Sequence, residues 1–302
     1  MGSGKIVRGL IGNTDPSGEV GGRVAQRVAA RGIRQRLIDL PDSQVPDLPH
    51  SERATMTGYA DHDSMQEALA GVETLFLVPV REHPERVHLH TAAVDAAVAG
   101  GVRRIVYSSF LGAGADSTFT LARDHFATEE HIRSKGVAFT FLRVSAYLEV
   151  LRWIIGSDGA IRGPAGDGRL APVARDDMAD TVAAVLTSDG AHDGETHDVT
   201  GPESISLQQI ADEFSLVTER RIVYVNEEPE EAWKSRRASG AADWQIAAWV
   251  STYLQIATGE LDVVSDTVPR ITGHPALSLR EFLAAHPENY EHLLDPPRQP
   301  PS

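Results

Sequence analysis

The chain has 302 residues, 41% hydrophobic and 24% charged, which is ordinary for a globular protein and long enough for one large domain or two smaller ones. Its formal net charge of −15 disfavours nucleic acid and anionic membranes as partners, because both repel an acidic surface. The lack of cysteine excludes disulfides and thiolate sites, and the lack of a signal peptide or of an apolar run near roughly 18 residues predicts a cytoplasmic protein.

The first half of the chain alternates short apolar runs with longer helical patterns. Strands are expected at residues 5–12, 34–40, 73–80, 103–110 and 137–144. Helices are expected at residues 21–32, 61–72, 84–102 and 124–136. Strands that alternate with helices form βαβ units with right-handed crossovers. The pattern therefore predicts an α/β fold, a Rossmann-like doubly wound parallel sheet, over residues 1–150.

After residue 150 this rhythm changes. A turn-rich stretch at 158–173 precedes an expected helix at 175–188, a strand at 195–201, a helix at 206–221, a strand at 221–228 and mostly helix to about residue 285. We expect residues 172–200 to return to the Rossmann-like domain. Residues 151–171 and 201–288 are expected to form a smaller C-terminal substrate domain beside a cleft, and the proline-rich residues 289–302 a disordered tail.

The stretch "GLIGNTDPSGEVGGRV" lies between the first expected strand and helix, where a dinucleotide-binding fold keeps its glycine loop. Gly18 and Gly21 have the spacing of the second and third glycines, which let backbone approach a pyrophosphate at a helix N-terminus. Gly12 lies six residues before Gly18, too far for the compact turn, and Asp15 and Glu19 add negative charge. A glycine-rich surface turn explains these residues equally well.

The second expected strand supplies a test of this loop. Asp39 stands at its end, 21 residues after Gly18, where an acidic residue binds the adenosine ribose of NAD and repels the extra phosphate of NADP. An ordinary turn residue explains Asp39 as well. Ser108 and Ser109 end the strand at 103–110, where they bind nicotinamide or substrate, or only cap the strand. The expected cofactor is NAD or NADP, and the absence of any cofactor stays open.

Three segments, "GVRRIVYSSFLGA", "FTLARDHFATEEHIRSKGVAFTFLR" and "YLEVL", resemble the NmrA-like atypical short-chain dehydrogenases, in particular the NAD(P)H:quinone oxidoreductase and triphenylmethane reductase branch. The similarity extends over nearly the whole chain and includes "GPAGDGRLAPVARDDMAD" and "DVTGPESISLQQIADEFS". The resemblance implies a Rossmann domain with a small C-terminal substrate domain. It also implies NAD(P) across the strand ends and reduction of quinone-like or other conjugated acceptors.

The sequence departs from this family where the cofactor is expected. Family members carry a short Thr-Gly-Ala-Thr-Gly loop, whereas extra residues separate Gly12 from Gly18 here. A basic residue commonly holds the NADP phosphate where this chain has Asp39. The third strand ends in Pro79-Val80 in place of Ser-Gly, and Leu142-Arg143-Val144 replaces Leu-Arg-Asn. These changes indicate altered or lost cofactor use.

The catalytic Tyr-x-x-x-Lys pair of ordinary short-chain dehydrogenases is absent. Hydride transfer then needs another acid, or an acceptor whose product takes its proton from water. The resemblance places His125 near the mouth of the active site with Glu129, one helical turn away, orienting it, and a histidine can shuttle a proton near neutrality. A helix-surface ion pair is the alternative. Tyr147 is expected to line the substrate pocket or to be a core aromatic.

Three histidines close together in the sequence invite a metal site. His88 and His90 are two residues apart and face different sides of a helix, and no carboxylate stands at ligand spacing to them or to His83. We therefore expect no metal.

Two functions remain. The first is an oxidoreductase that moves hydride from NAD(P)H to a conjugated, quinone-like or aromatic small molecule. The second is a repurposed relative whose degenerate nucleotide site serves a cofactor-independent lyase or cyclase on a natural-product-like substrate, or a redox-sensing binding protein. In both cases the expected partner is a small molecule, and neither nucleic acid nor a membrane is expected to bind. The sequence does not decide whether the chain forms a homodimer. The glycine loop discriminates between them, because a loop folded into the pyrophosphate space favours the second.

Overall fold

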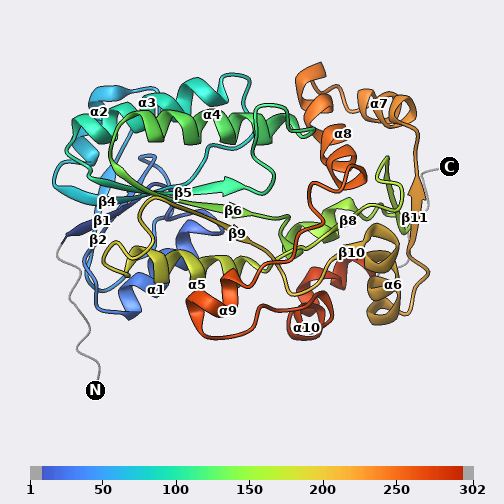
Figure 1. Ribbon diagram of the computed structural model, residues 1–302. Coiled ribbons are helices and arrows are strands. Elements are labelled where there is room, and N and C mark those ends of the chain that lie inside the picture. Colours follow the sequence, from blue (N-terminus) through green and yellow to red (C-terminus); the bar gives the residue numbers. More distant parts are fainter. Residues whose placement is uncertain (1–8, 295–302) are drawn as a thin grey trace.

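The computed structural model describes residues 9–294, and a seven-stranded sheet forms its centre (Figure 1). The strands follow the order β3-β2-β1-β4-β5-β6-β9, and all six pairings are parallel. Their bounds are β1 (Leu10–Asn13), β2 (Gln35–Asp39), β3 (Ser51–Thr55), β4 (Val72–Leu77), β5 (Arg104–Phe110), β6 (Ala138–Val144) and β9 (Glu195–Val199). This confirms the predicted Rossmann-like α/β fold.

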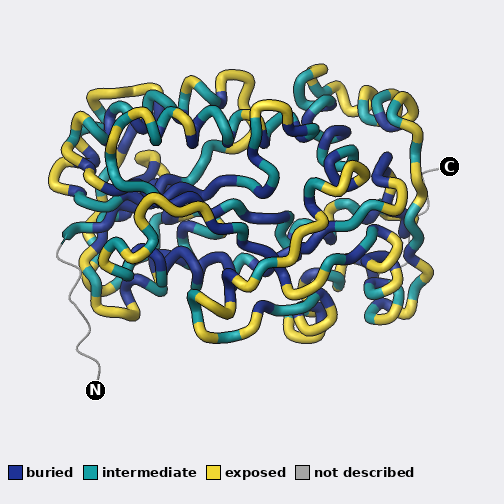
Figure 2. Tube along the Cα trace, viewed as in Figure 1, coloured by how far each residue is buried: buried dark blue, intermediate teal, exposed yellow. Residues whose placement is uncertain are grey.

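Helices cover both faces of the sheet. One layer contains α2 (His62–Ala68), α3 (Arg86–Ala99) and α4 (Thr120–Ser134), and the other contains α1 (Gly21–Ala30), α5 (Arg175–Leu186) and α9 (Thr267–Thr272). The central strands are apolar on both faces, as strands between two helix layers must be. Leu75, Phe76 and Ile105 are fully buried, and the most deeply buried part of the chain follows these strands (Figure 2).

The C-terminal part packs beyond the carboxyl ends of the strands. It consists of η1 (Leu148–Ile154), β7 (Ala160–Gly163), β8 (Arg169–Leu170), β10 (Ile205–Ser206), α6 (Leu207–Thr218), β11 (Val223–Asn226), α7 (Pro229–Arg237), α8 (Asp243–Ala257) and α10 (Leu279–Ala285). β7 pairs with β11 and β8 with β10, and a separate hydrophobic core includes Ile210, Phe214 and Phe282. Between these segments the chain returns to the main sheet through α5 and β9.

The structure differs from the elements expected from the sequence at several places, including the strands β7 and β8 within the stretch expected to be turn-rich. Strand β3 was not expected, because its sequence Ser-Glu-Arg-Ala-Thr is polar and half exposed at the sheet edge. Residues 289–294, expected in a disordered tail, contain the last residue of the 3₁₀ helix η2 (Pro287–Asn289) and all of the 3₁₀ helix η3 (Glu291–Leu293), since Leu293 is buried in the C-terminal core. Helix α4 begins at Thr120, four residues early.

Two expectations extend beyond the described residues. The first four residues of the strand expected at 5–12 and the remainder of the tail, 295–302, lie outside the described range. Within residues 9–294, no helix combines the length and the hydropathy needed to cross a membrane.

Candidate functional site

The loop between β1 and α1 is held together by its own polar groups. Asn13 accepts the Asp15 amide at 3.1 Å and donates to the Gly21 carbonyl at 2.8 Å, so that one side chain joins both ends of the loop. The Gly18 amide donates to the Asp15 carbonyl at 3.0 Å. A Cβ on Gly18 would overlap the Asp15 carboxylate, and one on Gly21 would overlap the Asp15 carbonyl. Both glycines therefore allow Asp15 to pack inward, a role that the sequence did not indicate.

Gly12 has a different role from the one expected in a phosphate-binding turn. It lies within β1, where its neighbours across the sheet, Val72 and Leu75, leave little room for a Cβ. The Thr14 hydroxyl, one residue beyond β1, accepts from the Val78 amide and the Tyr59 hydroxyl at 3.0 and 2.7 Å. These contacts fix the start of the loop to the end of β4.

Asp39 ends β2 as predicted, and both of its carboxylate oxygens have partners in the protein. Oδ2 accepts the Ser17 amide at 3.1 Å, while Oδ1 accepts the Leu40 amide and the Ser43 hydroxyl, each at 2.8 Å. The contact from Ser17 draws the glycine loop over the end of β2. A ribose at this position would have to replace it.

Negative charge gathers at this loop. Burial and, to a smaller extent, the nearby Asp39 and Glu19 carboxylates together raise the pKa of Asp15 to about 6, against the opposing effect of Arg81. A second anion, such as a diphosphate, is favoured beside the N-terminus of α1 but disfavoured by these carboxylates. The chemistry of Asp39 and the helix terminus therefore fits a dinucleotide, provided that Ser17 releases Asp39 and Asp15 is neutral or turned away.

His125 lies in a buried polar network. It is 5% exposed, its Nε2 lies 2.9 Å from Arg86 Nη2, and its Nδ1 lies 2.9 Å from the Tyr107 hydroxyl. Because a guanidinium only donates, Nε2 accepts and Nδ1 carries the proton. Burial, assisted by Arg86, holds the pKa of His125 well below its usual value. The ring is therefore neutral, and both nitrogens are occupied.

Glu129 is fully buried one turn along α4, but its partners differ from those of His125. Its carboxylate accepts the Ser109 hydroxyl at 2.6 Å and binds Arg143 through two bonds of 2.9 and 2.6 Å. The expected contact in which Glu129 orients His125 is not formed among the described residues. His125 faces α3 and β5, whereas Glu129 joins α4 to β5 and β6.

Ser108 and Tyr147 meet at the carboxyl ends of β5 and β6. Ser108 is buried, and it lies close enough to Tyr147 for its hydroxyl to lower the pKa of the Tyr147 phenol against the larger effect of burial. Burial raises the pKa of Tyr147, so this hydroxyl keeps its proton at neutral pH. The Arg175 guanidinium lies 5.6 Å from the centre of the Tyr147 ring. The structure therefore brings together two of the predicted residues, at the edge where a Rossmann sheet binds its ligand.

A cavity of about 670 Å³ separates these strand ends from the C-terminal part. Phe110 ends β5, and Ala146 follows β6; the opposite wall contains Trp249 and Tyr253, one turn apart on α8. The walls are predominantly apolar, and a partly buried ion pair of 3.0 Å between Glu227 and Arg236 is the main polar feature. Tyr147, expected at this pocket, is not one of its lining residues.

A cleft beside the C-terminal domain was expected, but most of its lining residues could not be identified from the sequence because they are scattered over about 150 positions. The sequence signal was a group of aromatics, Trp233, Trp244, Trp249 and Tyr253, expected either to meet a flat substrate or to form the core of the C-terminal domain; Trp249 and Tyr253 line the cavity. Trp249 also donates to Glu82 at 3.0 Å, which connects α8 to the segment after β4.

The histidines considered for a metal site do not converge. His90 Nε2 accepts the Val80 amide at 3.0 Å, and Nδ1 lies 2.9 Å from the Thr128 hydroxyl. Burial, with Arg86 nearby, lowers the pKa of His90 to about 3. Among the described residues, His83, His88 and His90 form no shared cluster of metal ligands.

Comparison with known proteins identifies the family of this chain. The model of the NmrA-like family matches residues 10–256. Quinone oxidoreductase 2 of Escherichia coli is 29% identical over 86% of this chain and 85% of its own length. The crystal structure of NADPH-dependent quinone oxidoreductase QOR2 from Escherichia coli, complexed with NADPH, has a TM-score of 0.79 and 26% identity, and covers 91% of this chain and 99% of that one.

A third likeness is to triphenylmethane reductase of Citrobacter sp., whose structure has a TM-score of 0.76 and 25% identity over 95% of this chain and 99% of that one. The chain belongs to the NmrA-like family. The predicted family and the predicted class of NAD(P)-dependent oxidoreductases are confirmed by these comparisons.

Proposed function

We propose that this protein reduces flat, apolar, conjugated molecules such as quinones, and that it uses NADH in preference to NADPH. The cavity at the carboxyl ends of β5 and β6 carries the proposal. Its volume of about 670 Å³ is that of a small-molecule site, and such sites are mostly apolar with a few polar groups. The names of the quinone oxidoreductase and triphenylmethane reductase relatives support an aromatic substrate.

The aromatic side chains of the cavity suit a planar substrate. Phe110 comes from the sheet, and Trp249 and Tyr253 come from α8. Aromatic rings attract one another in offset and edge-to-face arrangements, which add to the gain from apolar burial. A conjugated ring held here lies beside the strand ends that carry Ser108 and Tyr147.

The reduced nicotinamide ring, when bound, supplies a hydride. Asp39 would bind the adenosine ribose and repel a phosphate attached to it, which is the basis for the preference for NADH. Ser108 and Tyr147 would hold the opposite end by hydrogen bonds. The polar cavity of about 540 Å³ beside Ser17, Gly18 and Gly22 leaves space next to the N-terminus of α1.

The proton for the reduced product comes from water in this proposal. His125 is buried, neutral and occupied at both nitrogens, so it is not a proton donor to the cavity. The raised pKa of Tyr147 makes it a poor acid. A quinone accommodates this arrangement, because its reduced oxygen can take a proton from solvent.

One observation favours a second function, a relative that works without the dinucleotide. The Ser17 amide occupies Asp39, and Asp15 packs against Gly18 where a phosphate would approach. In that case the apolar cavity binds its ligand for non-redox chemistry or for sensing.

Titration of the full chain with NADH and with NADPH, followed by tryptophan fluorescence, separates the two. We expect weak but measurable binding, tighter for NADH, and NADH-dependent reduction of a small quinone. No binding of either cofactor at millimolar concentration contradicts the hydride-transfer proposal and favours the second function.

A variant on the cavity wall away from the cofactor tests the substrate assignment. Thr252 lines the cavity from α8, and Thr252→Trp should fill it and lower kcat/KM for the quinone about tenfold or more, with unchanged affinity for NADH. Thr252→Val, of similar size, is the control. Full activity of Thr252→Trp would place the substrate elsewhere.

A further inference from the structure

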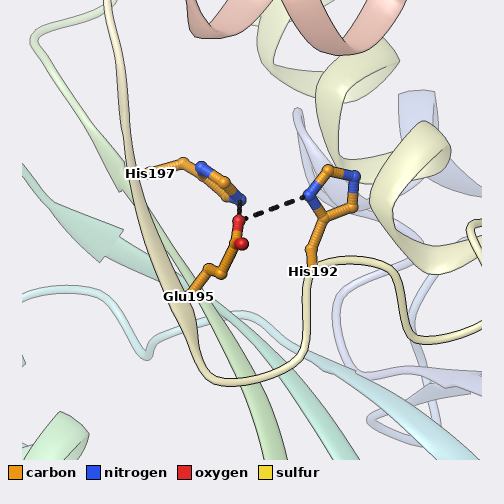
Figure 3. Close-up of side chains that lie close together, drawn as sticks. All are labelled: His192, Glu195 and His197. Carbon is orange, nitrogen blue, oxygen red and sulfur yellow. Dashed lines mark ion pairs between the residues drawn. The ribbon is translucent and has the colours of Figure 1, made fainter.

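Three potential metal ligands meet at the edge strand of the sheet: His192, Glu195 and His197 (Figure 3). Glu195 Oε2 lies 3.1 Å from His197 Nε2 and 3.7 Å from His192 Nδ1. One ligand atom from each residue falls within 4.8 Å of the others. The sequence analysis considered other histidines and did not identify this group.

The local fold explains why these side chains converge. The Glu195 amide donates to the His192 carbonyl at 3.2 Å, which closes a turn just before β9, and Gly194 within it has a φ of 81°. Glu195 and His197 are two residues apart in β9, so their side chains point to the same face of the sheet. The buried Thr140 on β6 also donates to the His192 carbonyl at 2.9 Å. The backbone beneath all three ligands is therefore fixed before any ion binds.

The His197 side chain has a buried ring nitrogen that lacks a hydrogen-bond partner among the described residues. It is 6% exposed, and within residues 9–294 its buried Nε2 has no hydrogen-bond partner. Glu195 lies at ion-pair distance, but the alignment is not that of a hydrogen bond. An unpaired polar atom in the interior is unfavourable and calls for a partner. The His197 Nε2 atom and the Glu195 carboxylate are placed so that one cation could bind to both.

We propose that His192, Glu195 and His197 bind a divalent transition metal ion, with Zn²⁺ as the best match. Two imidazoles and one carboxylate form a common zinc ligand set, and water completes the coordination. Ligand bonds of about 2.0–2.2 Å require the side chains to draw together slightly. Glu195, which is about half exposed, can make this movement.

The site is distinct from the proposed active site. Glu195 pairs with Thr140 near the start of β6, whereas the large cavity begins after the end of that strand. The ion would fasten the turn after α5 to the edge strand β9. Its role is therefore to stabilise the sheet edge, not to take part in hydride transfer.

Arg270 on α9 opposes the ion. Its Nη2 lies 3.4 Å from His197 Nδ1, and a guanidinium there requires Nδ1 to accept and Nε2 to carry the proton. Metal binding at Nε2 requires the other tautomer, in which Nε2 is free of its proton and Nδ1 carries it. Arg270 is held loosely, by contacts of 3.4 Å to Asp266 and to Thr267, and is about half exposed. Displacement of this side chain should accompany metal binding.

Isothermal titration of the chelator-treated full chain with ZnCl₂ tests the proposal. We expect one high-affinity equivalent that excess MgCl₂ does not displace, together with a rise in Tm. His192→Ala and Glu195→Gln should each weaken this binding about tenfold or more and abolish the rise in Tm. His131→Gln is the control, because His131 also pairs with a carboxylate, Asp95, at 2.7 Å.

Arg270→Gln should bind Zn²⁺ more tightly than the natural chain, since it removes the competing guanidinium. Unchanged or weaker binding contradicts the competition. If the natural chain binds no Zn²⁺, or if His192→Ala and Glu195→Gln bind it as the natural chain does, the proposed site is wrong. Neither variant depends on the buried His197, so loss of folding does not obscure the result.

Discussion

Most of the charged residues that the sequence indicated as functional lie in two regions of the molecule. In one region opposite charges are paired, and in the other like charges lie close together. On α4, Glu129 faces Arg143, and His125 accepts from Arg86, so that each buried group meets a complementary one. In the β1–α1 loop, Asp15 lies near two further carboxylates, Asp39 and Glu19. Polar residues in the first region stabilise the fold, whereas the crowding of carboxylates in the second region opposes it.

The difference shows how to separate a structural polar group from a functional one. A buried group with all its partners inside the protein can bind a ligand only by giving up one of them, as Asp39 would give up the Ser17 amide. A set of like charges at the ligand edge of a sheet carries an energetic penalty that packing alone does not explain, and such penalties concentrate at functional sites. Substitutions in the two regions should therefore change stability in opposite directions.

The largest effect is expected at Glu129. Glu129→Gln leaves the Arg143 guanidinium partly buried without its counter-ion, and breaking a buried ion pair costs about 3–5 kcal/mol in the free energy of unfolding. Chemical denaturation measures it. Glu130→Gln, on the exposed neighbour that pairs with Arg133, should change stability by less than about 1 kcal/mol. Similar values for both variants would contradict the buried role of Glu129.

His125→Ala should come next, at about 2–4 kcal/mol, because Arg86 and Tyr107 both lose a buried partner. Turnover of the folded protein should stay within about threefold of the natural chain, which corresponds to less than 1 kcal/mol in the barrier. His88→Ala, on the exposed face of α3, is the control. A loss of turnover at unchanged Tm would make His125 catalytic.

Asp15→Asn should instead stabilise the protein. The pKa of Asp15 is raised from 3.8 to about 6 on folding, so the folded state binds more protons than the unfolded state between these values. Stability therefore falls as pH rises through this window, by up to about 3 kcal/mol. The variant should exceed the natural chain in stability at pH 7.5 and match it near pH 4, as measured by denaturation.

The same substitution should strengthen dinucleotide binding, because it removes a negative charge from the phosphate position. We expect NADH affinity to rise about tenfold at pH 7.5, a difference of about 1.4 kcal/mol. In the natural chain, affinity should increase as pH falls toward 6. Asp42→Asn, in the exposed loop after β2, is the control, and an equal gain there would show only a general charge effect.

Asp39→Arg should change cofactor binding by a free energy of similar size. It should shift the preference from NADH toward NADPH about tenfold, since the guanidinium attracts the phosphate that Asp39 repels. Fluorescence titration with both cofactors measures the ratio. Asp42→Arg adds the same charge nearby. If both variants change the ratio equally, Asp39 does not contact the ribose.

The sequence by itself determined the fold class. Apolar runs such as "ETLFLVPV" are buried in the central strands because their side chains are apolar on both faces. It also placed Asp39 at the end of β2, since that position follows from strand length alone. The polar strand β3 escaped prediction because an edge strand needs little apolar character, and its pairing with β2 fixes it.

Only the tertiary structure decided what the polar residues do. His125 and Glu129 share one face of α4 in the sequence pattern, but partners from three other elements, Arg86, Ser109 and Arg143, draw them apart. The cavity likewise depends on chain segments that meet only after folding. Helical and strand periodicities specify which face a residue occupies, whereas charge pairing and burial depend on what packs against that face.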